Sequence, residues 1–286
     1  GRIGFSMAML SSTSRRFPRR RQTRAMAYEC AGDRGRVAPL TGCVMEGLFA
    51  ETNRATERVL AANGYAVAAA PGQGCCGALH AHAGDAEGAR RLARRNIAAF
   101  ERAAPDFVCV NAAGCGAAMK EYAHLLADDP EWRERADRFA AKVRDLSELV
   151  VVAGEGPRPG GAVQMKVAYD APCHLLHAQR VSSQPLAALR AIPGLQLVPL
   201  AESEMCCGSA GIYNLVEPET SDLVLQRKLK NIEAAGAEVV ATGNPGCMMQ
   251  IGAGLLRTGS KVAVVHPVDL LDESYAAAQD ETRTTR

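Results

Sequence analysis

The sequence predicts an α/β fold made of two similar small domains, each built on a parallel sheet. Three observations lead to this prediction. Short apolar strands alternate with longer helical segments along most of the chain, which is typical of parallel sheets. A pattern of cysteines occurs twice, and the second copy is shifted by 130 to 132 residues. A Gly/Pro-rich stretch, residues 154–161, separates the two copies and is the best candidate for a linker.

The composition is that of an ordinary globular protein, with 48% apolar and 22% charged residues. The 286 residues suffice for two domains of about 100–150 residues each. A net charge of +2 favours neither nucleic acid nor an anionic membrane as a partner. No stretch approaches the roughly 18 apolar residues of a spanning helix, and the apolar core of a secretory signal is missing. We therefore expect a cytoplasmic protein, at most peripheral at the inner face of the cell membrane, with reduced cysteines.

The first 36 residues are expected to form a basic, disordered tail. Its Arg-rich run, residues 15–21, has neither helical nor strand periodicity. Cys30 lies in this tail, and we assign it no role. The predicted divisions of the chain are the tail (1–36), a first cysteine-rich domain (37–152), the linker (153–164) and a second cysteine-rich domain (165–286).

The first repeat starts at Val37 with an apolar run that leads to Cys43. A turn of Pro and Gly precedes the doublet Cys75-Cys76. Asp85 should open a long helix, whose buried face at helical spacing would carry Ala89, Leu92, Ala93, Asn96 and Phe100. The other elements expected in this repeat are helices over 49–62, 117–126 and 131–150, and strands over 65–70 and 107–110.

The second repeat follows the same order of elements. Strands are expected over 167–169, 195–200, 238–242 and 262–265, and helices over 178–191, 218–234 and from Val268 onward. In α/β units of this kind, the loops that follow the strands gather at one edge of the sheet. The cysteines of the repeated pattern are expected in such loops, so each set of four can converge despite its separation in sequence.

Each copy of the cysteine pattern has an outlying cysteine, then a Cys-Cys-Gly doublet, then a final cysteine. In the first copy, Cys75 follows Cys43 by 32 residues and Cys115 follows Cys76 by 39. The corresponding separations in the second copy are 33 and 40 residues. The candidate ligands are two sets of four: Cys43, Cys75, Cys76 and Cys115, and Cys173, Cys206, Cys207 and Cys247.

Four thiolates in one pocket suit either zinc or an iron–sulfur cluster, because soft sulfur ligands select both. Structural zinc normally takes its thiolates from short C-x2-4-C hooks, and this chain has none. A vicinal pair is an awkward chelate for one tetrahedral ion, but it can bind two irons of one cluster. The Gly after each doublet leaves room for the backbone beside the cluster sulfides. The pattern favours a cluster, with zinc and metal-free thiols as alternatives.

Other polar residues near the doublets have ordinary explanations as well as functional ones. The histidines that follow predicted ligands are His80, His82, His174 and His177. They could donate hydrogen bonds to cluster sulfurs or relay protons, but surface or capping roles are favoured. Cys109 lies in an apolar strand and is expected to be a buried core thiol. Asn214 could line the second site or simply pack, and His266 is expected in a turn.

The doublets and the strings around them resemble the cysteine-rich CCG domain, which occurs in pairs in heterodisulfide reductase B subunits and in iron–sulfur subunits of respiratory flavoenzymes. Within that group, the chain is most similar to the glycolate oxidase iron–sulfur subunit. The resemblance covers about residues 37–275. The strings that carry it are LTGCV (40–44), CCGALH (75–80), RRNI (94–97), GCG (114–116), DLSE (145–148) and CCGSAG (206–211).

The resemblance implies an iron–sulfur electron-transfer subunit of a glycolate oxidase complex. Electrons would come from FAD-containing partner subunits that oxidise glycolate, and they would pass towards a membrane quinone. The eight paired cysteines would hold one cluster per repeat, expected to be of the 4Fe-4S type. The chain would be part of an enzyme but contribute no catalytic residue, because chemistry on the substrate belongs to the flavin. No nucleic-acid partner is expected.

Two departures from the family pattern restrict this expectation. Members that reduce heterodisulfides have a fifth cysteine three residues after each final cysteine, where this chain has Ala118 and Gln250. Full-length members of the glycolate oxidase type begin with a ferredoxin-like domain, which carries C-x2-C-x2-C-x3-C-P runs that this chain lacks. We therefore expect either a fragment or a separate chain that supplies those clusters. The alternatives left open are a heterodisulfide-reductase-like, lactate or glycerol-phosphate oxidoreductase subunit and a non-enzymatic zinc-stabilised scaffold.

Overall fold

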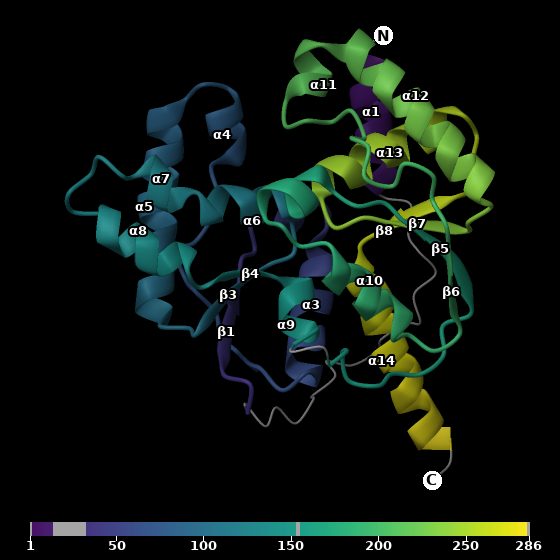
Figure 1. The fold of residues 1–286 in the computed structure, drawn as a ribbon, viewed down its shortest axis with the longest axis horizontal. Coiled ribbons are helices and arrows are strands. Elements are labelled where there is room, and N and C mark those ends of the chain that lie inside the picture. Colours follow the sequence, from purple (N-terminus) through teal and green to yellow (C-terminus); the bar gives the residue numbers. More distant parts are fainter. Residues whose placement is uncertain (1, 14–32, 153–154, 285–286) are drawn as a thin grey trace.

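The computed structural model describes residues 2–13, 33–152 and 155–284, which form two parallel sheets with helices packed around them (Figure 1). Each sheet has four strands, in the order β2-β1-β3-β4 in the first and β6-β5-β7-β8 in the second. The strands pair in parallel, and the two orders are equivalent, since each sheet has its second and fourth strands at its edges. The structure confirms the predicted α/β class and the internal repeat.

The first repeat folds much as its hydrophobic pattern predicts. Its strands are β1 (Arg36–Pro39), β2 (Ala66–Val67), β3 (Phe107–Val110) and β4 (Val143–Asp145). Its helices are α2 (Val44–Leu48), α3 (Ala50–Ala62), α4 (Ala78–His82), α5 (Ala86–Ala103), α6 (Ala113–Lys120), α7 (Tyr122–Leu125), α8 (Arg133–Ala140) and α9 (Leu146–Val150). Asp85 caps α5, because its carboxylate accepts the Gly88 N–H at 2.8 Å. The predicted face of this helix carries the buried Asn96 and Phe100, and Ile97 is buried as well.

The second repeat has the same arrangement with longer terminal helices. Its strands are β5 (Met165–Tyr169), β6 (Leu195–Val198), β7 (Val239–Ala241) and β8 (Ala263–Val265). Its helices are the π-helix η1 (His174–Ala178), α10 (Ser183–Arg190), α11 (Tyr213–Val216), α12 (Pro218–Ala235), α13 (Pro245–Arg257) and α14 (Pro267–Thr284). Within the described ranges, no helix is both long and apolar enough to cross a membrane.

The two sheets lie on either side of one shared hydrophobic core. Alternate strand residues point to opposite faces of a sheet. Val37 of β1 and Val167 of β5 therefore both face the central cluster, which α3, α9, α10 and α14 complete. Ala38 and Val108 face an outer cluster under α5 and α8, and Val240 faces another under α12 and α13. Because these strands are buried on both faces, they read as continuous apolar runs in the sequence.

Direct contacts between α3 and α14 hold the two repeats together. Arg58 of α3 forms a bidentate ion pair with Asp272 of α14, with a closest N–O distance of 2.7 Å. Asn63 donates a hydrogen bond to the Tyr275 hydroxyl at 2.9 Å. The largest core cluster also draws on both repeats. The division into two domains joined by a linker at residues 153–164 stays a prediction.

The sequence misassigned a few short elements. The helix expected over 131–150 is instead α8, strand β4 and α9, because the edge strand β4 pairs with β3 in the folded protein. The strand expected over 65–70 is reduced to the two residues of β2. The helix expected over 178–191 is shortened to α10, and the separate π-helix η1 precedes it.

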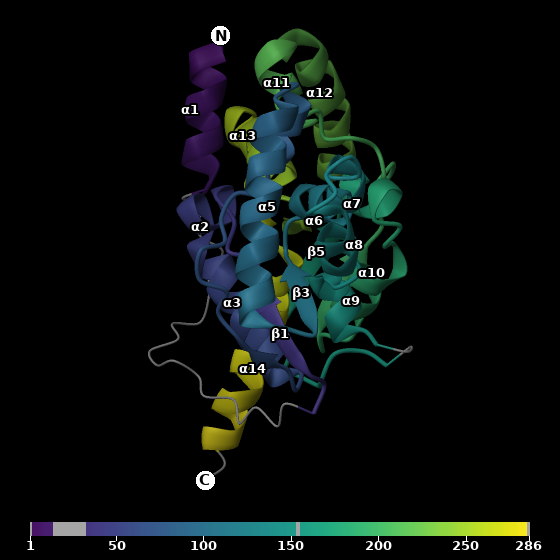
Figure 2. The same cartoon turned by 90° about the vertical axis from the view of Figure 1, so that its left-hand side faces the viewer.

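The expectation of a disordered tail is wrong for residues 2–13, which form helix α1 (Arg2–Thr13). This helix packs against α13 (Figure 2). Phe5 packs against the outer core of the second repeat, with the Arg257 guanidinium 5.4 Å from its ring centroid. Gly252 makes close approach possible, since a Cβ there would lie only 2.9 Å from the Cβ of Ser12. The Arg-rich run and Cys30 lie outside the described residues.

A buried carboxyl group gives the fold a predicted pH dependence. Asp145 ends β4 and caps α9 in a capping box with Glu148. Burial raises the pKa of Asp145 from 3.8 to about 6, against hydrogen bonds from Ser147 that lower it. The folded state therefore binds this proton more tightly than the unfolded state, so the stabilisation is full below pH 3.8 and is lost as the pH rises through about 6.

Asp145→Asn should remove this dependence and leave the fold unchanged. A pKa rise of this size corresponds to about 3 kcal/mol. We expect the free energy of unfolding of the variant, relative to the wild type, to increase by up to that amount between pH 4 and pH 7. Urea unfolding followed by circular dichroism at several pH values measures this difference. Parallel pH profiles for the two proteins would show that Asp145 ionises normally.

Candidate functional site

The structure brings the first set of cysteines together at the carboxyl edge of the first sheet. Cys43 immediately precedes α2, and its Sγ lies 3.6 Å from the Sγ of Cys75. The Cys75 thiol is also in hydrogen-bonding contact with Cys76, and Cys76 with Cys115. The four sulfurs thus form a continuous chain of neighbours. Cys43 is exposed, whereas Cys76 is buried beneath the site.

The second set converges in the same way at the edge of the second sheet. The Cys206 thiol contacts Cys173 and Cys207, and Cys207 contacts Cys247. The expectation that all eight cysteines lie in loops is wrong for Cys115 and Cys247, which lie in the first turns of α6 and α13. Both helices begin just after a strand, so their first turns still lie at the sheet edge.

The glycine after each doublet aims a backbone donor at a sulfur. Gly77 and Gly208 have φ values of +84° and +91°, a left-handed conformation that favours glycine. In this conformation the Gly77 N–H donates to the Cys75 Sγ at 3.4 Å, and the Gly208 N–H donates to the Cys206 Sγ at 3.3 Å. The two doublets therefore share one local geometry.

This geometry stabilises a thiolate at the first cysteine of each doublet. Hydrogen bonds from Cys43 and then from Cys76 lower the pKa of Cys75 to about 2. In the second set, hydrogen bonds from Cys173 and then from Cys207 lower the pKa of Cys206 to about 2. The Gly77 and Gly208 N–H groups add to both shifts. The pKa of Cys43 is raised, chiefly because its thiol donates a hydrogen bond to the Cys75 sulfur. Thiolates are the form of cysteine that binds metals.

Buried polar side chains fix the first doublet from behind. Asn96 of α5 accepts the Gly74 N–H and donates to the Cys75 carbonyl, both at 2.9 Å. The Tyr122 hydroxyl donates to the Cys76 carbonyl at 2.7 Å. Asn96 was predicted only as part of a buried helix face, and Tyr122 had no signal in the sequence. Their role depends on α5 and α7 meeting behind the doublet.

A different network fixes the second doublet. Gln250 donates to the Ser221 hydroxyl at 3.0 Å, and Ser221 donates to the Gly208 carbonyl at 2.8 Å. Asn214 donates to Gln250 at 2.9 Å, so it belongs to this support rather than to an exposed surface. Gln250 occupies the position of the fifth cysteine in the disulfide-reducing relatives described above. Here that position supports the doublet loop.

A buried ion pair also lies behind the second doublet. The Lys228 ammonium is 2.7 Å from the Asp170 carboxylate, and both side chains are at most 2% exposed. Lys228 also donates to the carbonyls of Glu202 and Ser203 at 3.0 and 3.2 Å, just before the doublet. The pair therefore ties helix α12 to the end of β5 and to the loop that carries Cys206.

Histidines join the two repeats near the cysteines. The rings of His82 and His174 lie edge to face, with centroids 5.8 Å apart. Burial lowers the pKa of His174, and the neighbouring His82 lowers it further. His266 is more than a turn residue, because its Nε2 lies 2.7 Å from the Asn111 carbonyl of the first repeat. Its Nδ1 accepts the Val268 N–H, so Nε2 carries the proton.

A cleft of about 230 Å³ opens beside the first cysteine set, between the two repeats. Cys43, Cys75, Cys76 and Cys115 line one side of it, and residues of the second repeat, such as Asn244 and Met249, line the other. The four sulfurs of the first set and the open space beside them are both compatible with a bound metal cluster. A group that binds four soft sulfurs can reach all four from this cleft.

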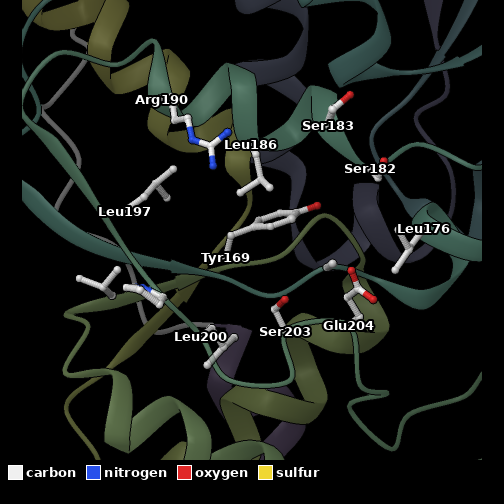
Figure 3. A pocket seen from close by; sticks show the side chains of 13 residues that line it. Tyr169, Leu176, Ser182, Ser183, Leu186, Arg190, Leu197, Leu200, Ser203 and Glu204 are labelled. Atoms are coloured by element: carbon white, nitrogen blue, oxygen red, sulfur yellow. The ribbon is translucent and has the colours of Figure 1, made fainter.

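A larger open pocket of about 560 Å³ lies beside the second set (Figure 3). Ser203 and Glu204, which precede the second doublet, form one wall, and Arg190 of α10 lies at another end. The Tyr169 ring lies between them, with its hydroxyl towards Ser182. The pocket therefore opens a charged, solvent-accessible surface next to the loop that carries Cys206, because Glu204 lies two residues before that cysteine in the sequence.

Gly208→Ala should damage the second set more than Gly77→Ala damages the first. A Cβ on Gly208 would lie 2.5 Å from the Ser221 carbonyl oxygen, a backbone atom, whereas a Cβ on Gly77 would lie 3.3 Å from its nearest neighbour, Ala89 Cα. We expect Gly208→Ala to abolish metal binding at the second set and Gly77→Ala to weaken it about tenfold at the first. Metal content per chain tests this. Equal losses would mean that left-handed strain, common to both positions, dominates over the clash.

Comparison with known proteins adds independent information. The family model described as "CCG: Cysteine-rich domain" matches residues 37–120 and 167–252. The chain is 42% identical over 249 residues to the "Probable glycolate oxidase iron-sulfur subunit" of Bacillus subtilis, which covers 84% of this chain and 54% of the relative. The chain thus spans about half the length of that relative.

Two shorter relatives match over almost their whole length. The chain is 31% identical over 242 residues to "Lactate utilization protein A" of Exiguobacterium sp., covering 85% of this chain and 99% of the relative. It is also 31% identical over 230 residues to the protein of the same name from Shouchella clausii, covering 80% and 95%. Both cysteine sets lie within the two matched repeats.

Proposed function

The chain belongs to the CCG cysteine-rich domain family, and from this premise we propose that it is an iron–sulfur electron-transfer subunit of a 2-hydroxy-acid oxidase, for glycolate or lactate. One observation carries the proposal. In both repeats, four cysteines far apart in sequence meet at a sheet edge, and a backbone N–H donates to the same doublet sulfur. Such donors around thiolates are typical of clusters that exchange electrons.

The residues of each set fit a cluster. Cys43, Cys75, Cys76 and Cys115 would hold one, and Cys173, Cys206, Cys207 and Cys247 would hold a second, each of the 4Fe-4S type. A bound cluster supplies reversible uptake and release of one electron. The glycine N–H groups stabilise negative charge on sulfur, and the buried networks behind the doublets keep the ligands in place.

The spacing of the cysteines argues against a zinc-stabilised scaffold. Structural zinc normally takes its thiolates from short C-x2-4-C hooks. Neither cysteine set contains such a hook. Heterodisulfide reduction is also disfavoured, since Gln250 and Ala118 replace the fifth cysteines.

The partners follow from the same proposal. FAD-containing subunits would oxidise the hydroxy acid and deliver electrons, and a ferredoxin-like domain or chain would accompany them. A membrane quinone would be the final acceptor, which places the complex in the cytoplasm at the inner face of the membrane. The chain alone should therefore not reduce a dye with glycolate or lactate, and addition of flavin subunits should establish that activity.

Metal analysis of anaerobically purified protein tests the proposal. Iron, acid-labile sulfide and zinc are measured per chain, and EPR spectra are recorded before and after dithionite. About eight irons with equal sulfide and a reducible signal would support two clusters. About four irons would mean that only one set is loaded. Zinc without sulfide, in a colourless protein, would overturn electron transfer and leave the scaffold.

A further inference from the structure

Asn244 connects the two cysteine sets through its side chain. It follows β7 and directly precedes α13. Its Nδ2 donates to the Cys247 Sγ at 3.4 Å. Its Oδ1 accepts the backbone N–H of Gly114 at 3.1 Å, and Gly114 adjoins Cys115 of the first set. A single amide therefore reaches from the final cysteine of one set to the neighbour of the final cysteine of the other.

The orientation of this amide is fixed by its partners. The Gly114 N–H is a donor and requires the amide oxygen, so the amide nitrogen must face the sulfur. A second bond between the same segments, from the Ala113 N–H to the Gly243 carbonyl at 3.0 Å, holds the two backbones together. The N–H that points at Cys247 is thus a consequence of the contact between the repeats.

Asn244 makes these contacts instead of capping the helix that it precedes. It occupies the N-cap of α13, where an asparagine side chain normally accepts an N–H from the first helical turn. No such capping bond is formed among the described residues. The side chain faces Cys247 and the first repeat instead.

The first repeat has no equivalent donor. The position three residues before Cys115 is Ala112, which is the N-cap of α6 just as Asn244 is the N-cap of α13. Alanine has no side-chain N–H to offer to Cys115. The bonds from Gly77 and Gly208, in contrast, occur in both repeats. Asn244 is therefore one of the features that make the two sets unequal, together with His174 Nδ1, which lies 3.7 Å from the Cys173 sulfur, and the buried Lys228 near Cys206.

We propose that Asn244 raises the reduction potential of the second centre relative to the first, and so biases an electron within the chain towards the Cys173–Cys247 set. This inference rests on the proposed function, since it requires clusters. A hydrogen bond to a ligand sulfur stabilises the reduced state, because that state places more negative charge on sulfur. Asn244 is thus a tuning residue for the second centre.

The test compares redox titrations, monitored by EPR, of the wild type, Asn244→Ala and Asn244→Asp. Aspartate keeps an oxygen for the Gly114 N–H but replaces the donor to Cys247 with a negative charge. Alanine loses both contacts and adds no charge, so the fall in the alanine variant assigns the effect to the lost donor. In both variants we expect the potential of one centre to fall and that of the other to stay unchanged. The constant for electron exchange between the centres should change about tenfold, which is about 59 mV for one electron.

Gln179→Ala is the matched control. Gln179 donates to the Ala113 carbonyl across the same junction at 2.9 Å, and the described structure shows no hydrogen bond from it to a cysteine sulfur. The inference is wrong if Gln179→Ala shifts the potential equally, or if Asn244→Asp retains its iron with unchanged potentials. If Asn244→Ala fails to load iron, unchanged potentials in Asn244→Asp still overturn the inference. Absence of iron and sulfide from the wild type would overturn the proposed function and this inference together.

Discussion

Cys207→Ser is expected to remove about half of the iron from the protein and to abolish one of its two reducible EPR signals. Cys207 is buried and contacts both Cys206 and Cys247, so its loss breaks the chain of sulfurs in the second set. Serine is a poor ligand for iron compared with a thiolate. Cys75→Ser should remove the other half and the other signal. Iron and sulfide analysis with EPR of each purified variant measures both effects.

Cys109→Ala is the control for these substitutions. Cys109 is fully buried in β3 and belongs to neither set, as predicted from its apolar strand, so the variant should keep all its iron. Loss of both centres from either single serine variant would show that the sets are not independent. The bridge through Asn244 makes this a stringent test, because it connects the two sites directly.

Lys228→Met should lower the free energy of unfolding by about 3–5 kcal/mol at pH 7. The Lys228 ammonium is fully buried and pairs with Asp170, so its removal leaves a buried carboxylate without its cation. Burial already raises the pKa of Asp170, with Lys228 opposing this rise. Without Lys228 the pKa should rise further. The deficit should therefore shrink as the pH falls and Asp170 is protonated.

Two variants separate this explanation from a simple packing defect. Lys228→Met combined with Asp170→Asn removes both charges and should recover most of the stability. Lys230→Met, an exposed position on the same helix, should change the free energy of unfolding by less than about 0.5 kcal/mol. Urea unfolding provides all four values. A double variant no more stable than Lys228→Met would assign the loss to packing around the lysine.

The sequence alone determined the class of the fold and the composition of the candidate site. Strand and helix patterns are local, because buried parallel strands such as residues 107–110 are continuously apolar and α5 is amphipathic. The doublets Cys75-Cys76 and Cys206-Cys207 are local too, and their repeated spacing indicated which outlying cysteines belong to which set. The structure brings each predicted set of four sulfurs together, and their role as ligands stays a prediction.

Only the tertiary structure decided the surroundings of that site. Helix α1 is held by its contact with α13, β4 by its pairing with β3, and Lys228 by a carboxylate on another element. His266 was expected in a turn and Asn244 was given no role, because their partners, Asn111 and Gly114, lie more than 100 residues away in sequence. The local sequence pattern indicates which residues are apolar and which, such as glycine and proline, favour turns. It does not record which distant backbone group will meet a side chain, since that is fixed only when the two repeats pack on one core.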